Sequence, residues 1–143
     1  MTRALVIAIA AVALLGCGPK AAGTSTTEYR AFTEHYAFNI ASVPSPPHAR
    51  EKTLFKIRVR DKNTSQPIEG GEGIIYGNTE DNAGKTWDSF TPGQAPGTYT
   101  AKLEFVIATN WALALQFRKD STQALEKVDT WYQTVLPDTS ATH

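Results

Sequence analysis

The chain has 143 residues, with fourteen Lys and Arg, fourteen Asp and Glu, and a single Cys. This length allows one domain and hardly more. The formal net charge of zero excludes the overall basic character expected of a nucleic-acid-binding protein. One Cys excludes an intrachain disulfide framework and an all-Cys metal cage.

The N-terminus has the pattern of an export signal. Arg3 precedes an unbroken run of Ala, Leu, Val and Ile over residues 4–15. As a helix this run rises only about 18 Å, well short of the roughly 30 Å hydrocarbon core of a bilayer. We therefore interpret residues 1–16 as a signal peptide and not as a membrane-spanning or buried core helix.

The end of this run, Leu14-Leu15-Gly16-Cys17, resembles the lipobox of bacterial lipoproteins. The resemblance implies that Cys17 is the lipid attachment site, acylated with palmitate and further chains, since stable anchoring needs more than one. The alternative is an ordinary signal peptide with an incidental Cys. Gly18 is not the Asp that commonly retains lipoproteins at the inner membrane. The expected location is therefore the cell envelope outside the cytoplasm, and the periplasmic side of the outer membrane if the source has two membranes.

Small and polar residues flank the expected domain. Residues 18–33 lack a sustained periodicity, so we predict a flexible tether over 17–33. A disordered tail is predicted over 137–143. The folded domain is therefore expected over residues 34–136.

Within that domain, apolar residues alternate with a period of two, which predicts strands. The clearest example is the series Phe55, Ile57 and Val59 between basic neighbours. The candidate segments are 36–40, 55–59, 74–77, 86–91, 99–105, 111–117 and 124–136. About seven short strands separated by Pro and Gly are typical of an all-β, immunoglobulin-like β-sandwich.

The last of these segments is ambiguous. Leu125, Val128, Tyr132 and Val135 have the spacing of a helix stripe. The β-branched and aromatic residues of 130–135 favour a strand instead. We favour a final strand, with a helix over 124–136 as the alternative.

Several motifs, in their order along the chain, resemble the YtkA-like and FixH-like group of small immunoglobulin-like domains. They are the strand Phe55–Asp61, Gln66-Pro67-Ile68, Gly70-Gly71, Pro96-Gly97-Thr98-Tyr99 and a strand beginning at Trp111. The match covers roughly residues 36–118. The resemblance implies an exported or membrane-tethered sandwich, and some members of the group are linked to copper handling or oxidase assembly.

The chain departs from that group where a metal would bind. Related domains often carry Met and His after the Pro-containing corner, whereas this chain has Glu72, Glu80 and Asp81 there. Copper(I) prefers thioether, thiolate or imidazole ligands. We therefore expect no metal and no cofactor. Convergence of His35 and His48 is the weak alternative.

The sequence also lacks a recognisable catalytic constellation. It has no G-x-S-x-G nucleophile elbow, and Cys17 is assigned to the lipid. The acidic residues Glu72, Glu80 and Asp81 are interpreted as part of a solvated acidic loop over 69–85, with a weak calcium site as the alternative. We predict that the protein is not an enzyme.

The aromatic residues are the remaining candidates for ligand contact. Trp111 lies in register with Leu113 and Leu115, which predicts a core position. Trp87 and Trp131 are candidate ligand-facing aromatics, and either one on an exposed face would indicate a binding surface. We predict an accessory lipoprotein that docks another envelope protein through an edge strand or the acidic loop. The alternatives are a copper- or metal-handling module and a carbohydrate-binding module that uses Trp87 or Trp131.

Overall fold

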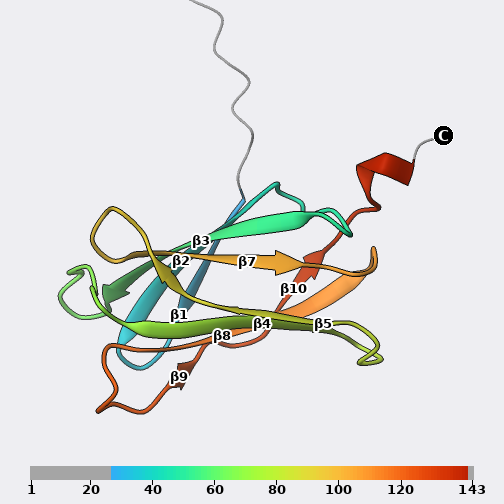
Figure 1. Ribbon diagram of the computed structural model, residues 1–143. Helices are drawn as coiled ribbons and strands as arrows, with labels where there is room; N and C mark the ends of the chain where they lie inside the picture. Colours follow the sequence, from blue (N-terminus) through green and yellow to red (C-terminus); the bar gives the residue numbers. More distant parts are fainter. Residues whose placement is uncertain (1–26, 142–143) are drawn as a thin grey trace, which may run out of the picture.

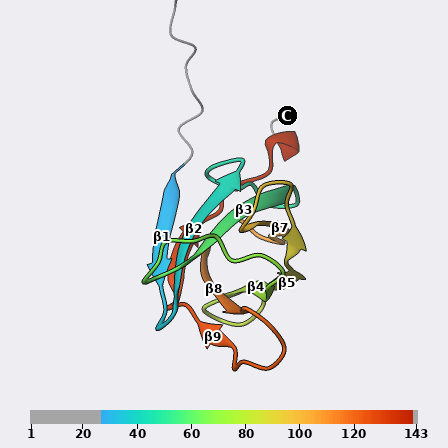
Figure 2. The same cartoon turned by 90° about the vertical axis from the view of Figure 1, so that its left-hand side faces the viewer.

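Two antiparallel sheets face each other in the computed structural model, which describes residues 27–141 (Figures 1 and 2). The first sheet has the strand order β1-β2-β3-β7-β6, and the second has the order β10-β8-β4-β5, with β9 also paired to β8. The strands are β1 (Glu28–Phe32), β2 (Tyr36–Val43), β3 (Lys52–Asp61), β4 (Glu72–Thr79), β5 (Lys85–Ser89), β6 (Thr91–Pro92), β7 (Thr98–Glu104), β8 (Asn110–Arg118), β9 (Glu126–Lys127) and β10 (Trp131–Thr134). The predicted all-β, immunoglobulin-like β-sandwich is confirmed.

The period-two pattern of the sequence determines which face of each sheet is buried. In β3, Phe55, Ile57 and Val59 are buried, and the basic residues between them are exposed. The same alternation runs through β2 and β7, which flank β3 on either side. Each sheet therefore contributes one apolar face to a shared core.

Aromatic rings form much of that core. Phe117 on β8 lies 5.0 Å from the Tyr36 ring and 5.6 Å from the Tyr99 ring, measured between centroids, so it joins the two sheets. Trp111 is fully buried, as predicted, and its indole N–H donates to the Ile107 carbonyl at 3.0 Å. Every residue of the buried hydrophobic cluster lies between residues 31 and 135. The described residues thus contain a complete two-sheet unit.

The described residues form ten strands where the sequence predicts about seven. β1 precedes the predicted segments, β6 follows β5, and the predicted segment 124–136 divides into β9 and β10. β1 falls inside the range predicted as a flexible tether, yet all five of its residues pair with β2. Ala31 is buried in the core, and Tyr29 packs against it. The folded region therefore begins near Glu28 and not at residue 34. Residues 1–26, which include the predicted signal peptide and Cys17, lie outside the described residues.

The ambiguous C-terminal segment forms strands and not a helix, with β9 and β10 both pairing to β8. The chain then continues in a short 3-10 helix, Thr139–Ala141. The backbone N–H and hydroxyl of Thr139 both donate to a Glu51 carboxylate oxygen, at 3.1 and 2.6 Å. The ordered part thus extends past the predicted boundary at residue 136. No helix within residues 27–141 is long and apolar enough to cross a bilayer.

Candidate functional site

The outer face of the second sheet carries the two most exposed large hydrophobic side chains of the described residues. These are Trp87 on β5, which is 66% exposed, and Tyr132 on β10, which is 78% exposed. Trp87 points outward because residues alternate along β5. Its neighbours Thr86 and Asp88 accept hydrogen bonds from the β7 backbone N–H groups of Glu104 and Lys102, at 3.4 and 2.7 Å. The two polar neighbours thus close the edge of the sandwich and leave Trp87 on the outer surface.

Strand register determines what lies beside Trp87. Tyr76 on β4 is the direct cross-strand partner of Trp87, and Ala114 on β8 is the next residue in the same row. In the adjacent row, Tyr132 pairs with Ala112. Three strand spacings separate β5 from β10, about 14 Å. The outer face therefore has aromatic side chains toward both edges and small alanines between them.

A hollow of about 550 Å³ lies at the β4–β5 end of this face. Its lining combines the Trp87 and Tyr76 rings with the amides of Asn78 and Asn82 and the ammonium group of Lys85. Thr86 also borders it, but the Thr86 hydroxyl accepts the hydrogen bond from β7. No Asp or Glu of the described residues lines it. The hollow therefore offers aromatic faces beside hydrogen-bond donors and acceptors, an arrangement suited to a polar ligand that also has apolar faces.

The turn after β4 holds one wall of this hollow in place. The Asp81 carboxylate accepts hydrogen bonds from the Thr79 hydroxyl at 2.6 Å and from the Ala83 N–H at 3.1 Å. These two hydrogen bonds lower the pKa of Asp81, and the one from the Thr79 hydroxyl has the larger effect. The Asn78 amide donates to the side-chain oxygen of Asn82 at 3.1 Å. Asp81 therefore has a structural role in this turn.

The three acidic residues that were expected to share one loop lie at opposite ends of β4, with Glu72 at its start and Glu80 and Asp81 after its end. Most of the range 69–85 is occupied by β4 and its flanking turn. Glu72 begins β4 and forms an ion pair with Arg118 at 2.7 Å. Glu80 and Asp81 follow the other end of the strand, about 26 Å away along its length. The predicted acidic loop is therefore replaced by a strand that separates its members.

Trp131, the second candidate ligand-facing aromatic, is only 8% exposed and belongs to the buried cluster. Its ring stacks on Tyr29 of β1, with centroids 4.9 Å apart and planes 21° apart. This pair joins the β1 edge of the first sheet to the β10 edge of the second. Trp131 is therefore part of the core, and Trp87 is the exposed tryptophan of the described residues.

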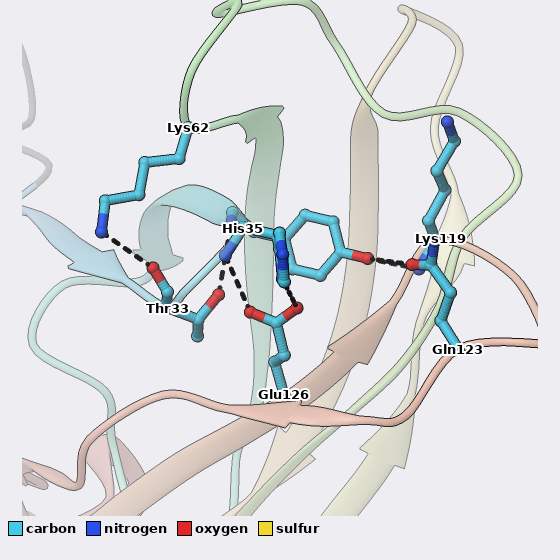
Figure 3. A network of polar contacts seen from close by, with 7 residues as sticks. Thr33, His35, Lys62, Lys119, Gln123 and Glu126 are labelled. Carbon is cyan, nitrogen blue, oxygen red and sulfur yellow. Dashed lines mark hydrogen bonds and ion pairs between the residues drawn. The ribbon is translucent and has the colours of Figure 1, made fainter.

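The two candidate metal-binding histidines lie beyond opposite ends of β2 and do not converge. His35 Nδ1 lies 2.8 Å from a Glu126 carboxylate oxygen, and the backbone N–H of His35 donates to the other oxygen at 2.9 Å (Figure 3). His48 Nδ1 lies 3.0 Å from the Pro137 carbonyl oxygen. Across residues 27–141, no three His, Cys, Asp or Glu side chains gather in a way that could hold a metal ion.

The His35–Glu126 contact connects the β1–β2 turn to β9. The hydrogen bond with Glu126, and then its negative charge, raise the pKa of His35. Burial acts to raise the pKa of Glu126, but hydrogen bonds from His35 and Thr33 outweigh it, so that pKa is lowered. Lys62 Nζ also donates to the Thr33 carbonyl at 3.1 Å (Figure 3). This polar network fastens the β1–β2 turn to β9 and to Lys62.

The sequence alone singles out Trp87, whereas its polar neighbours Asn78, Thr86 and Lys85 emerge only from the structure. Their signal in the sequence is weak, because alternation in a short strand does not show which strand lies beside it. No family model, curated protein or solved structure matches this chain.

Proposed function

We propose that this protein is a non-catalytic binding module of the cell envelope, tethered through lipid on Cys17, and that its Trp87 face binds a glycan. The observation that supports the ligand class most directly is the hollow in which Trp87 and Tyr76 lie beside Asn78, Asn82 and Lys85. The fold contributes a rigid platform, since Trp87 and Tyr76 stand on paired strands.

The chemistry of a pyranose ring suits this surface. One face of the ring presents C–H groups, which carry a slight positive charge and pack on the negative face of an aromatic ring. Its hydroxyls require donors and acceptors at the rim, which the amide and ammonium groups supply. Because Lys85 lines the hollow and no carboxylate of the described residues does, the surface suits anionic as well as neutral sugars.

The test is a fluorescence titration of residues 18–143 with a panel of soluble oligosaccharides of β-linked hexoses and N-acetylhexosamines. Trp111 and Trp131 are buried, so a change in solute quenching reports on Trp87. We expect saturable binding to at least one oligosaccharide. Isothermal titration calorimetry, which needs no tryptophan reporter, compares the variants. Trp87→Ala should weaken binding at least tenfold, as loss of an aromatic anchor does in other interfaces.

Leu125→Ala is the matched control, because Leu125 is also exposed but does not line the hollow. It should bind like the wild type. Affinity that survives Trp87→Ala at the wild-type level would refute the assignment of this face.

Docking of an envelope protein along β1 is a second candidate. β1 ends the first sheet and has one neighbouring strand, β2, which leaves one side of its backbone free for strand addition. Crosslinking from Arg30, which is exposed on β1, would capture such a partner in intact cells. The same crosslinker on Lys127 of β9 serves as the control, and equal capture from both positions would argue against this docking mode.

A further inference from the structure

The outer face of the first sheet is strongly basic. Alternation along β3 turns four basic side chains to this face, and β1 and β7 contribute one each. These residues, all exposed, are Lys52, Lys56, Arg58, Arg60, Arg30 and Lys102. Register brings them into neighbouring rows across the sheet. We call this surface the basic face.

The basic face shows that charge is segregated within a chain of zero net charge. Of the described residues, twelve are Lys or Arg and fourteen are Asp or Glu. Six of the twelve cations lie on this face, with only Glu28 and Glu104 as outward-facing carboxylates of its strands. The face thus has a net charge of +4, and the remainder of the described residues has −6.

Exposed apolar side chains border the cations on the same face. Phe32 on β1 is 60% exposed and lies in one row with Ala37 and Arg60. Val43, which is 44% exposed, pairs with Leu54 at the opposite corner. Basic side chains with a bordering aromatic ring are the combination that binds an anionic lipid–water interface.

The distance to the expected anchor agrees with such an interface. Residues 18–26 separate Cys17 from the first described residue, Thr27, and the ten Cα–Cα steps from 17 to 27 span at most about 35 Å when fully extended. The chain then enters β1 at Glu28, which belongs to the basic face. Tethering at that range gives the face a high effective concentration at the bilayer, so weak contacts suffice to orient the domain.

We propose that the basic face docks on anionic phospholipid headgroups of the membrane that holds the lipid anchor. This inference rests on the anchor in the proposed function and not on its glycan. Because the two sheets stack in layers (Figure 2), docking through the first sheet turns the Trp87 face away from the bilayer. The domain would then hold one face to the membrane and offer the other to the envelope space.

The test uses residues 18–143, which lack Cys17 and contain the complete two-sheet unit, with vesicles of phosphatidylcholine alone or mixed with phosphatidylglycerol. We expect sedimentation with the anionic vesicles only, and loss of binding as salt rises, because the Debye length shortens from about 10 Å at 0.1 M to 3 Å at 1 M. Equal binding to both vesicle types would overturn the proposal.

A pair of charge-matched variants separates the basic face from net charge. Lys56→Glu/Lys102→Glu should reduce the partition coefficient at least twentyfold, since each basic residue at an anionic surface contributes about fivefold. Lys119→Glu/Lys127→Glu makes the same charge change away from this face and should stay within about threefold of wild type. A comparable loss in both variants would overturn the assignment to the basic face.

Two further variants complete the design. Phe32→Ser should weaken vesicle binding several-fold without altering the salt dependence. Trp87→Ala should bind vesicles like the wild type, so failure of membrane docking and failure of glycan binding are distinguishable. Binding to soluble polyphosphate without binding to vesicles would overturn the membrane assignment.

Discussion

The Tyr99 hydroxyl on β7 donates a 2.6 Å hydrogen bond to the Ile68 carbonyl and accepts one of 3.0 Å from the Gly71 N–H. Tyr99 is buried, and its burial raises the pKa of the phenol. A single hydroxyl thus satisfies two backbone groups of the corner that precedes β4. This contact fixes where the second sheet begins relative to the first.

Tyr99→Phe should therefore destabilise the protein. The substitution keeps the ring but leaves the Ile68 carbonyl and the Gly71 N–H without their partner, at a cost of about 1–3 kcal/mol. Urea unfolding of the purified domain measures this cost. Tyr132→Phe, at an exposed position, should change the free energy of unfolding by less than about 0.5 kcal/mol. Equal stability of the two variants would contradict the role of the Tyr99 hydroxyl.

The two candidate tryptophans should differ sharply in stability. Trp131→Ala removes a buried ring stacked on Tyr29 and should cost about 3–5 kcal/mol. Trp87→Ala removes an exposed ring and should stay within about 0.5 kcal/mol of the wild type. Guanidinium unfolding monitored by circular dichroism compares the variants without relying on tryptophan emission. A large loss of stability in Trp87→Ala would show that it is structural.

Two glycines with the same backbone conformation offer a matched comparison. Gly70 has φ of 70° and Gly97 has φ of 72°. A Cβ at residue 70 would meet no atom within 4 Å, whereas one at residue 97 would lie 2.8 Å from the Val59 carbonyl oxygen and 2.7 Å from the Pro67 Cβ. Gly70→Ala should therefore cost only the backbone penalty, about 1–2 kcal/mol.

Gly97→Ala should cost at least about 1 kcal/mol more than Gly70→Ala, because the close contact is added to the same penalty. The difference between their thermal midpoints isolates the close approach of residue 97 to β3. Equal midpoints for the two variants would show that the loop before β7 relaxes freely.

The sheet strands were predictable where alternation is long and one face is buried. β3 has ten residues and β8 has nine, so each contains several repeats of the period-two pattern. The same pattern in β8 places Trp111 in the core. β1 has five residues and becomes recognisable only through its pairing with β2. The helix-like spacing near the C-terminus was coincidental. Val128 and Val135 are buried while Leu125 and Tyr132 are exposed, so the four residues do not form one stripe.

The expected acidic loop was wrong because β4 extends over Glu72–Thr79, beyond the predicted segment 74–77. Gly73 and Gly77 lie inside β4, where a Cβ would come within 2.5 Å of the Phe90 ring and 2.4 Å of the Leu113 side chain. These glycines make room for packing and do not mark turns. The burial of Trp131 could not be predicted from the sequence, because it depends on Tyr29, which lies on a strand about one hundred residues earlier in the chain. The alternation of Lys56, Arg58 and Arg60 was visible in the sequence. Which carboxylates lie beside these cations is known only from the structure, where Glu28 of β1 forms an ion pair with Arg58 at 3.2 Å and Lys56 lies opposite Thr100 of β7.

The ion pair between His35 and Glu126 predicts a pH dependence of stability. The hydrogen bond to Glu126 raises the pKa of His35 above 6.5. The contribution of His35 to stability is therefore complete below pH 6.5 and is lost as pH rises through the raised pKa. The pKa of Glu126 is lowered below 4.5. The contribution of Glu126 to stability is therefore present above pH 4.5 and is lost as pH falls through the lowered pKa. The contact should stabilise the fold most between about pH 4.5 and 6.5.

Urea midpoints measured at pH 5.5 and 8.5 test this dependence. From pH 5.5 to pH 8.5 the urea midpoint of the wild type should decrease, and this decrease should be larger than that of His35→Ala, which lacks the imidazole. Glu126→Gln keeps the shape of the carboxylate without its charge and should flatten the dependence in the same way. Lys127→Gln, on the same strand, should follow the wild type. If His35→Ala shows the full wild-type change in midpoint, the pH dependence arises elsewhere in the molecule, and the β1–β2 turn is held by its backbone hydrogen bonds alone.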